Sequence, residues 1–244
     1  VVDSCETIIF LSDEASYDQF CIDKIRNAEA LFIAGGDQYD YVSQWQGTPI
    51  EDAIHYVAAK GAPIGGTSAG LAILSEFSFT AEFDTIESWM ALSDPYHKKV
   101  AVGDDFLELS NMEDKITDSH FVARDRMGRL VTFLARIVND GMADQARGIG
   151  IEEGTALAVE PNGDVTLFSA CNITPGVAYF LTTPGIPEVC EENTPLTYTG
   201  ILVHRIHNGD SFNIVSWTGA GGTDYTLSAV DGVLTSSQAD GSIY

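Results

Sequence analysis

The stretch that decides the fold is APIGGTSAGL, residues 62–71, in which a short apolar run ends in a glycine-rich turn. We expect a strand at residues 62–64 and the beginning of a helix at residues 71–77. Between them, Gly66-x-Ser68-x-Gly70 has the form of a nucleophile elbow, in which small residues let neighbouring segments pass close by and the serine hydroxyl stands clear of the backbone. A tight structural turn is the alternative interpretation.

Strand-like and helix-like segments alternate on both sides of this turn, which predicts a parallel α/β sheet. The further strands are expected at residues 7–11, 30–34 and 115–117, and the helices at residues 18–28, 49–60 and 126–140. From Gly148 the pattern changes, and from residue 156 it consists of short strands separated by turn signals such as Asn162-Gly163. We therefore expect one domain over residues 1–244, with a βα core at 1–155 and a β-rich completion at 156–244.

The chain is strongly acidic, with 12 basic and 36 acidic residues and a formal net charge of −24 at pH 7. Such a surface repels phosphate groups, which argues against nucleic-acid partners and anionic membranes, and it attracts cationic substrates. Adaptation to high salt produces the same charge. No apolar run approaches the ~20 residues that a membrane span needs.

Four cysteines, Cys5, Cys21, Cys171 and Cys190, form no C-x-x-C pair, which argues against a zinc or thioredoxin-type site. Their even number in two local pairs predicts two disulfides in an exported protein, with four buried thiols in a cytosolic protein as the alternative. We therefore expect a secreted or periplasmic location, with the cytoplasm as the alternative. Because the chain starts at Val1 without a visible signal peptide, we expect a processed chain or a fragment.

A second glycine-rich turn, GGDQ at residues 35–38, follows the strand expected at 30–34. In open parallel sheets, ligands bind beyond the carboxyl ends of the strands, so we expect this turn and the Ser68 turn to share one crevice. Gly36 and Asp37 would offer backbone N–H groups there, Gln38 its side-chain amide, and Ala69 an N–H group at a helix start. An ordinary loop is the alternative interpretation.

A serine nucleophile needs a base at neutral pH, and His120 is the candidate that the pattern favours. It follows the strand expected at residues 115–117 and precedes the amphipathic helix at 126–140, so it also lies at the carboxyl end of a strand. A hydrogen-bonded structural histidine is the alternative.

Three arginines, Arg124, Arg126 and Arg129, follow His120 closely. Their guanidinium groups would hold a substrate carboxylate through fork-shaped hydrogen bonds. Surface pairing with acidic residues is the alternative, since charge runs commonly have that role.

Three motifs together resemble the cyanophycinase-like serine peptidases of peptidase family S51, which are related to the aspartyl dipeptidases. They are GGDQ at 35–38, GTSAG at 66–70 and DSHFVARDRMGRL at 118–130. The likeness is clearest over residues 30–155, which include GIGIEEGTA at 148–156. It implies a flavodoxin-like three-layer α/β sandwich with a mostly parallel central sheet, akin to the class I glutamine amidotransferases.

The resemblance also implies a serine exopeptidase that hydrolyses aspartyl or β-aspartyl bonds through an acyl-enzyme, without a metal or organic cofactor. Cyanophycinases cut multi-arginyl-polyaspartate into β-Asp-Arg dipeptides, and many are homodimers. The residues implied are Ser68 as nucleophile, His120 as base, Gly36, Asp37 and Ala69 as oxyanion donors, and Gln38, Arg124, Arg126 and Arg129 as substrate contacts.

Some features depart from the family pattern. Ser119 stands where the family often has glutamine, which affects substrate contacts. The stretch between nucleophile and base is longer than usual, so the triad acid stays open among Glu87, Asp84 and Glu82, with Glu87 favoured. The chain also starts after the family's first strand, so we expect a missing N-terminal segment or a redrawn topology.

Two other functions stay open on these residues. An α/β-hydrolase-type esterase has the same elbow but a late histidine, which favours His204 or His207 as the base of Ser68. A catalytically silent homologue would bind peptides or small molecules in the same pocket without turnover.

Overall fold

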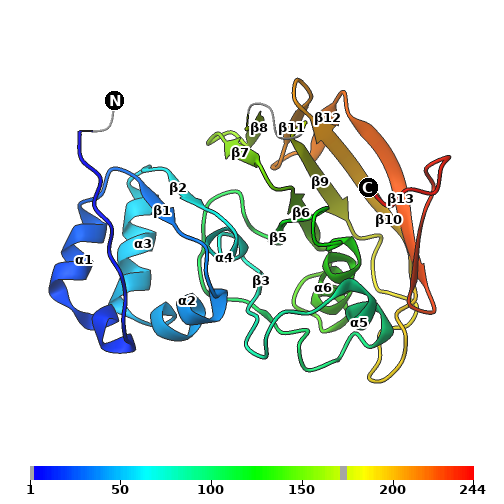
Figure 1. The fold of residues 1–244 in the computed structure, drawn as a ribbon, viewed down its shortest axis with the longest axis horizontal. Helices are drawn as coiled ribbons and strands as arrows, with labels where there is room; N and C mark the ends of the chain where they lie inside the picture. Colours follow the sequence, from blue (N-terminus) through cyan, green and yellow to red (C-terminus); the bar gives the residue numbers. More distant parts are fainter. Residues whose placement is uncertain (1–2, 171–174) are drawn as a thin grey trace.

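The computed structural model describes residues 3–170 and 175–244. Figure 1 shows the first helices with β1 and β2 at one end of the molecule, and the larger sheets with α5 and α6 at the other. The helices are the 3-10 helix η1 (Asp13–Tyr17), α1 (Gln19–Arg26), α2 (Gln38–Trp45), α3 (Pro49–Ala59), α4 (Ala69–Ala72), α5 (Ser88–Ser93) and α6 (Met127–Asn139).

The strands that the structure describes fall into four sheets. They are β1 (Leu31–Ile33), β2 (Ile64–Gly66), β3 (Ser78–Phe79), β4 (Val102–Gly103), β5 (Lys115–Ser119), β6 (Arg147–Ile151), β7 (Thr155–Val159), β8 (Asp164–Ser169), β9 (Val177–Thr182), β10 (Tyr198–His207), β11 (Ser211–Asn213), β12 (Thr218–Ala220), β13 (Thr223–Val230) and β14 (Val233–Ser236). The largest sheet has the order β14-β13-β10-β9-β6-β5, a second has the order β12-β11-β8-β7, and β1-β2 and β3-β4 are separate pairs.

The helices form where the amphipathic patterns place them. α3 begins at Pro49 after Thr48, whose side-chain oxygen accepts the Ile50 N–H, and its apolar face is buried. α6 buries nearly all of its length and lies against β6, where an added Cβ on Gly148 would stand 3.1 Å from a Leu130 methyl carbon. These two helices confirm the predictions for residues 49–60 and 126–140 to within a residue or two at their ends.

The predicted flavodoxin-like arrangement with a mostly parallel central sheet is not what the structure shows. Among the described residues, the parallel strand pairs are β1–β2 and β5–β6, and the other pairs within the sheets are antiparallel. The physical reason lies in the connections. After β6 the chain returns through tight turns such as that at Gly163, with φ +87°, and no helix among the described residues follows β6 to form the crossover that a parallel pair requires.

Two further predictions are wrong in the structure. Residues 7–11 are not a strand: Ile8 and Phe10 pack on the core around α3, Ile9 is 74% exposed, and the segment finds no neighbouring strand to pair with among the described residues. The predicted Cys5–Cys21 disulfide is also absent, since both are free thiols.

Cys190 is likewise a free, buried thiol, and Cys171, its predicted partner, lies outside the described residues. Over residues 3–170 and 175–244, no helix combines the length and hydrophobicity needed to cross a bilayer.

The elbow at residues 66–70 depends on its two glycines. A Cβ added to Gly66 would lie 2.2 Å from the Gly70 carbonyl oxygen, and one added to Gly70 would lie 2.2 Å from the Ile33 carbonyl oxygen. The close passage of backbones that the motif predicts is therefore confirmed: the turn packs directly on the end of β1.

We expect Gly70→Ala to lower the free energy of unfolding by about 1–3 kcal/mol, because the methyl group must displace backbone atoms. Thermal or urea unfolding measures this. The matched control is Gly65→Ala, whose Cβ would meet a Phe32 ring carbon at an ordinary 3.4 Å. That control should change stability by less than about 1 kcal/mol. Equal melting temperatures for the two variants would contradict the packing argument.

Candidate active site

Ser68 stands at the apex of the turn between β2 and α4. Its backbone angles, φ 53° and ψ −116°, are seldom adopted by non-glycine residues, so the surrounding packing holds it in a strained conformation. Its hydroxyl does not cap α4. Gly35 packs closely against Ser68, because a Cβ added to Gly35 would lie 3.1 Å from the Ser68 Cβ. The sequence assigned no such spacing role to Gly35.

His120 directly follows β5 and reaches Ser68. The distance from His120 Nε2 to Ser68 Oγ is 3.0 Å, and that from His120 Nδ1 to Glu153 Oε1 is 2.5 Å. When Nδ1 carries the proton and donates to Glu153, Nε2 is free to accept the hydroxyl hydrogen of Ser68. The hydrogen bond from His120 lowers the pKa of Glu153 below its ordinary 4.5, so this carboxyl stays ionised at neutral pH. The three side chains form the hydrogen-bond chain of a serine–histidine–carboxylate triad.

The register of β5 and β6 explains why Glu153 meets His120. These strands are parallel, with Ser119 opposite Ile151, so the segments that leave their carboxyl ends lie beside each other. Glu153 comes two residues after the end of β6, and His120 one residue after the end of β5. The signal was present in the sequence as two acidic residues after an apolar strand, within the GIGIEEGTA stretch.

The favoured acid, Glu87, therefore needs correction, because the carboxylate on His120 is that of Glu153. Glu87 precedes α5 and lines the pocket from the segment of residues 81–87. Asp84 pairs with Lys99 at 2.7 Å, and Glu82 accepts a long 3.5 Å bond from the Tyr39 hydroxyl. All three belong to the segment of residues 82–87, whereas His120 Nδ1 bonds Glu153, just beyond the end of β6.

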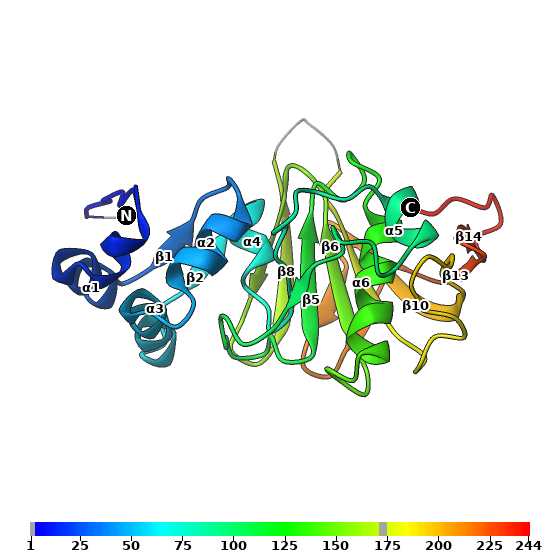
Figure 2. The ribbon, with the colours of Figure 1, turned by 90° about the horizontal axis from the view of Figure 1, so that it is seen from below.

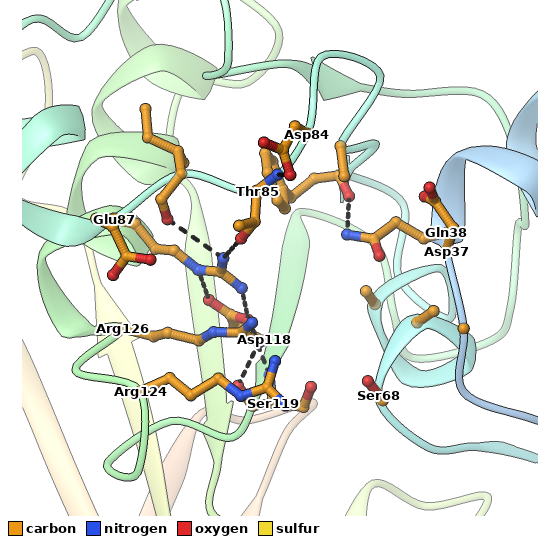
Figure 3. Close-up of a pocket in the computed structure, with 17 residues that line it drawn as sticks. Asp37, Gln38, Ser68, Asp84, Thr85, Glu87, Asp118, Ser119, Arg124 and Arg126 are labelled. Carbon is orange, nitrogen blue, oxygen red and sulfur yellow. Dashed lines mark hydrogen bonds and ion pairs between the residues drawn. The ribbon is translucent and has the colours of Figure 1, made fainter.

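Ser68 opens into a pocket of about 320 Å³. Figure 3 shows Ser68, Asp37 and Gln38 on one wall and Asp118, Arg124 and Arg126 on the opposite one. Gly36, Asp37 and Ala69 also line it, and among the described residues no hydrogen-bond acceptor is assigned to their backbone N–H groups. The three residues predicted as oxyanion donors thus all line the pocket into which Ser68 opens. Gln38 is there too, but its amide donates to the Phe79 carbonyl at 3.1 Å.

The three predicted substrate arginines differ in how far they are already engaged. Arg129 is 3% exposed, and its Nε and Nη2 donate to the two carboxylate oxygens of Asp118 at 2.7 and 2.5 Å. Its remaining Nη1 reaches Thr85 Oγ1 at 3.1 Å. The Arg129 guanidinium is therefore engaged in a buried ion pair with Asp118 rather than available to a substrate.

Arg126 and Arg124 are more available. Arg126 donates to the Ser119 carbonyl at 2.8 Å and to Asp118 at 3.3 Å, and burial lowers its pKa to about 10, which leaves it charged at neutral pH. Arg124 is exposed, and the described residues provide no hydrogen-bonded or ionic partner for its guanidinium. Arg124 and Arg126 are thus the cations that face the pocket with capacity to bind an anion.

The structure does not bring the late histidines to Ser68. His204 Nδ1 bonds Asp224 at 2.6 Å and its ring stacks on Phe212, while His207 Nδ1 bonds the Gly176 carbonyl at 3.1 Å. In the part of the chain that the structure describes, no three His, Cys, Asp or Glu side chains form a group able to hold a metal ion.

A strand–turn–helix serine that bonds a histidine, which bonds a carboxylate, is the arrangement of serine hydrolases. The chain belongs to peptidase family S51, whose family profile matches residues 7–167. The resemblance of the three motifs is thereby confirmed.

Two curated relatives illustrate the similarity. The chain is 24% identical to a cyanophycinase of Synechococcus elongatus over 209 residues, which are 85% of this chain and 60% of the relative. It is 28% identical to a cyanophycinase of Trichormus variabilis over 189 residues, which are 77% of this chain and 58% of the relative. The chain thus aligns with about three fifths of each relative's length.

Among solved structures, the crystal structure of a peptidase from an acI-B1 Actinobacterium has a similar fold. The TM-score is 0.53 at 14% identity, and the match covers 83% of this chain and 66% of that one. This likeness supports the mixed α/β fold.

We expect Asp118→Asn to destabilise the protein by about 3–5 kcal/mol, because it leaves the buried Arg129 guanidinium without its counter-charge. Urea unfolding measures the loss. Arg124→Gln is the control, since it removes an exposed cation without a bonded partner, and should change stability by less than about 0.5 kcal/mol. If Asp118→Asn is as stable as Arg124→Gln, Arg129 is not committed to Asp118 and is available to a substrate.

Proposed function

We propose that this chain is a serine exopeptidase of the cyanophycinase type, which hydrolyses aspartyl or β-aspartyl peptide bonds. The observation that carries the proposal is the hydrogen-bond chain from Ser68 Oγ through His120 to Glu153 at the edge of an arginine-lined pocket. Family membership and the cyanophycinase names of the relatives support the same reaction.

In the proposed mechanism, Ser68 Oγ attacks the scissile carbonyl while His120 Nε2 takes the hydroxyl proton. His120 returns that proton to the leaving amine, and a water molecule then releases the acyl group by the same steps in reverse. Glu153 holds the imidazole in the required tautomer and stabilises its charged form. The N–H groups of Gly36, Asp37 and Ala69 would bind the oxyanion, and a donor of this kind contributes about 3–4 kcal/mol.

The charges of the pocket favour a substrate that carries a free carboxylate close to the scissile bond. Arg124 and Arg126 lie on the wall opposite Ser68, so a carboxylate bound there would place a neighbouring amide over the nucleophile. Glu87 lines the same pocket and would accept a cationic substituent. Aspartyl peptides with a basic side chain, including multi-arginyl-polyaspartate, combine both features.

We expect Ser68→Ala and His120→Ala each to lower kcat by at least about 10³-fold, and Glu153→Gln by about 10²–10⁴-fold, because each interrupts the same proton path. Glu87→Gln should leave kcat on an aspartyl dipeptide without a cationic side chain within about twofold and raise KM for an arginine-containing one. Steady-state hydrolysis, with products identified by mass, measures both. A Glu87→Gln variant without activity alongside an active Glu153→Gln variant would reverse the assignment of the acid.

Ionisation of Glu153 should set no limb of the pH profile near neutrality. Because the pKa of Glu153 is lowered from 4.5, its carboxylate is present above that pH and is lost only at lower pH. Any acid limb of kcat/KM that lies above pH 4.5 should therefore persist in Glu153→Gln, on a lower plateau. Disappearance of the limb in Glu153→Gln would contradict this assignment.

A fluorophosphonate probe separates catalysis from binding alone. We expect wild-type protein to be labelled at Ser68, and Ser68→Ala to stay unlabelled. An intact Ser68 that is not labelled between pH 6 and 9, in a protein that still binds aspartyl peptides, would favour the silent homologue. Exopeptidase action is tested with peptides whose ends are free and with the same peptides after their ends are blocked. An exopeptidase should release residues only from a free end, so the blocked peptides should stay intact.

A further inference from the structure

The segment of residues 120–127 joins β5 to α6 and carries His120, Arg124 and Arg126 of the site. Two of its residues, His120 with φ 50° and Asp125 with φ 48°, lie in the left-handed region that non-glycine residues seldom adopt. Such a backbone persists only where the surroundings determine it, so contacts from elsewhere in the chain must fix this turn.

Contacts from two elements hold the first part and the middle of the segment. Glu152 Oε2 accepts the N–H groups of Val122 at 2.5 Å and Ala123 at 3.1 Å. Ser88 Oγ donates to the Asp125 carbonyl. The Glu152 bonds and the Glu153 bond to His120 hold the base from the β6 side, and the Ser88 bond holds Asp125 from α5.

Tyr244 holds the end of the segment. Its hydroxyl donates to Asp125 Oδ1 at 2.9 Å and accepts the Met127 N–H at 3.1 Å. Met127 begins α6, whose preceding residue offers no side-chain cap, so Tyr244 supplies the acceptor that this helix start needs. Burial raises the pKa of the Tyr244 hydroxyl, which therefore keeps the proton that it donates.

Aromatic packing fixes Tyr244 itself. Its ring meets those of Phe121 and Tyr179 edge to face, with centroid separations of 6.1 and 5.9 Å. Gln238 and Ser242 hold its backbone carbonyl, at 3.3 and 2.7 Å. Figures 1 and 2 both show this end of the chain at the end of the molecule that carries α5 and α6, away from α1. A residue far along the sequence thus contacts both Phe121, next to the base, and Asp125, which lies between Arg124 and Arg126.

We propose that Tyr244 is a positioning residue that fixes the Asp125 turn and, through it, the guanidinium groups of Arg124 and Arg126 at the pocket. The inference rests on the proposed function, because those arginines are its substrate contacts. His120 has its own support in Glu153 and Glu152, so Tyr244 acts on substrate binding rather than on the proton path.

Tyr244→Phe tests this, since it keeps the ring packing and removes only the hydroxyl. We expect KM for an aspartyl dipeptide to rise about fivefold, as for the loss of one net hydrogen bond. We expect kcat to stay within about twofold and the acid limb of the pH profile to stay in place. Tyr198→Phe is the matched control: Tyr198 is fully buried, its hydroxyl bonds the Gly185 carbonyl, and its removal should leave KM unchanged.

A double-mutant cycle with Asp125→Ala locates the effect. If Tyr244 acts through Asp125, the KM increases of the two single variants should not multiply in the double variant. Fully multiplicative effects, or a proportional loss of kcat in Tyr244→Phe, would overturn the positioning role.

Amide hydrogen exchange gives a readout that does not depend on turnover. In Tyr244→Phe, the Met127 amide loses its acceptor, so it should exchange about fivefold faster, while Tyr198→Phe leaves it unchanged. If the wild-type protein hydrolyses no aspartyl substrate, the proposed function fails. Unchanged exchange of the Met127 amide in Tyr244→Phe would separately overturn the positioning role of Tyr244.

Discussion

The candidate site depends on how residues 71–77 dock against β5. Thr117 Oγ1 donates to the Leu71 carbonyl at 2.8 Å, and the Thr117 N–H donates to Ser75 Oγ at 3.1 Å. The Phe77 N–H then bonds the Lys115 carbonyl at 3.0 Å, next to the Phe77–Ile116 bridge. Ser68 belongs to the small β1–β2 unit and His120 to the six-stranded sheet. These buried bonds therefore set the 3.0 Å separation between nucleophile and base.

At both reacting groups, Ser68 and His120, packing and hydrogen bonds stabilise a strained backbone conformation. Ser68 and His120 each have a positive φ. His120 directly follows β5, and Ser68 comes two residues after the end of β2. The glycines at 66 and 70 allow the elbow to pack on β1, and the acidic pair after β6 holds the imidazole turn. Packing thus holds in place two backbone conformations that local propensity disfavours.

On the pocket wall that carries the arginines, some charges stabilise the fold and others are available to bind a substrate. Asp118 neutralises the buried Arg129, which would otherwise be an uncompensated charge, and also touches Arg126. That pairing leaves the Arg124 charge and part of the Arg126 hydrogen-bonding capacity for an anion. In a chain with a net charge of −24, Arg124 and Arg126 thus supply cationic groups on the wall opposite the nucleophile.

Much of the site was predictable from residue patterns, because a nucleophile elbow imposes local requirements on a few adjacent residues. The strand–turn–helix around Ser68, the GGDQ turn and the position of His120 all follow from short-range chemistry. The helices at 49–60 and 126–140 were equally readable, since each has an apolar face that needs burial. The prediction of a mostly parallel sheet was wrong, because local strand patterns do not specify which strands become neighbours or in which direction they run.

The sequence by itself determined the elbow, its two obligatory glycines and the candidates for base and substrate arginines, since these depend on backbone geometry within a few residues. Only the tertiary structure decided that Glu153 rather than Glu87 meets His120, because the register of β5 and β6 places that carboxylate there. The same holds for Arg129, whose commitment to Asp118 follows from the burial of both groups. It holds also for Tyr244, whose contact with Asp125 joins residues 119 positions apart. Contacts of this kind depend on how whole elements pack, which a local pattern of residues does not encode.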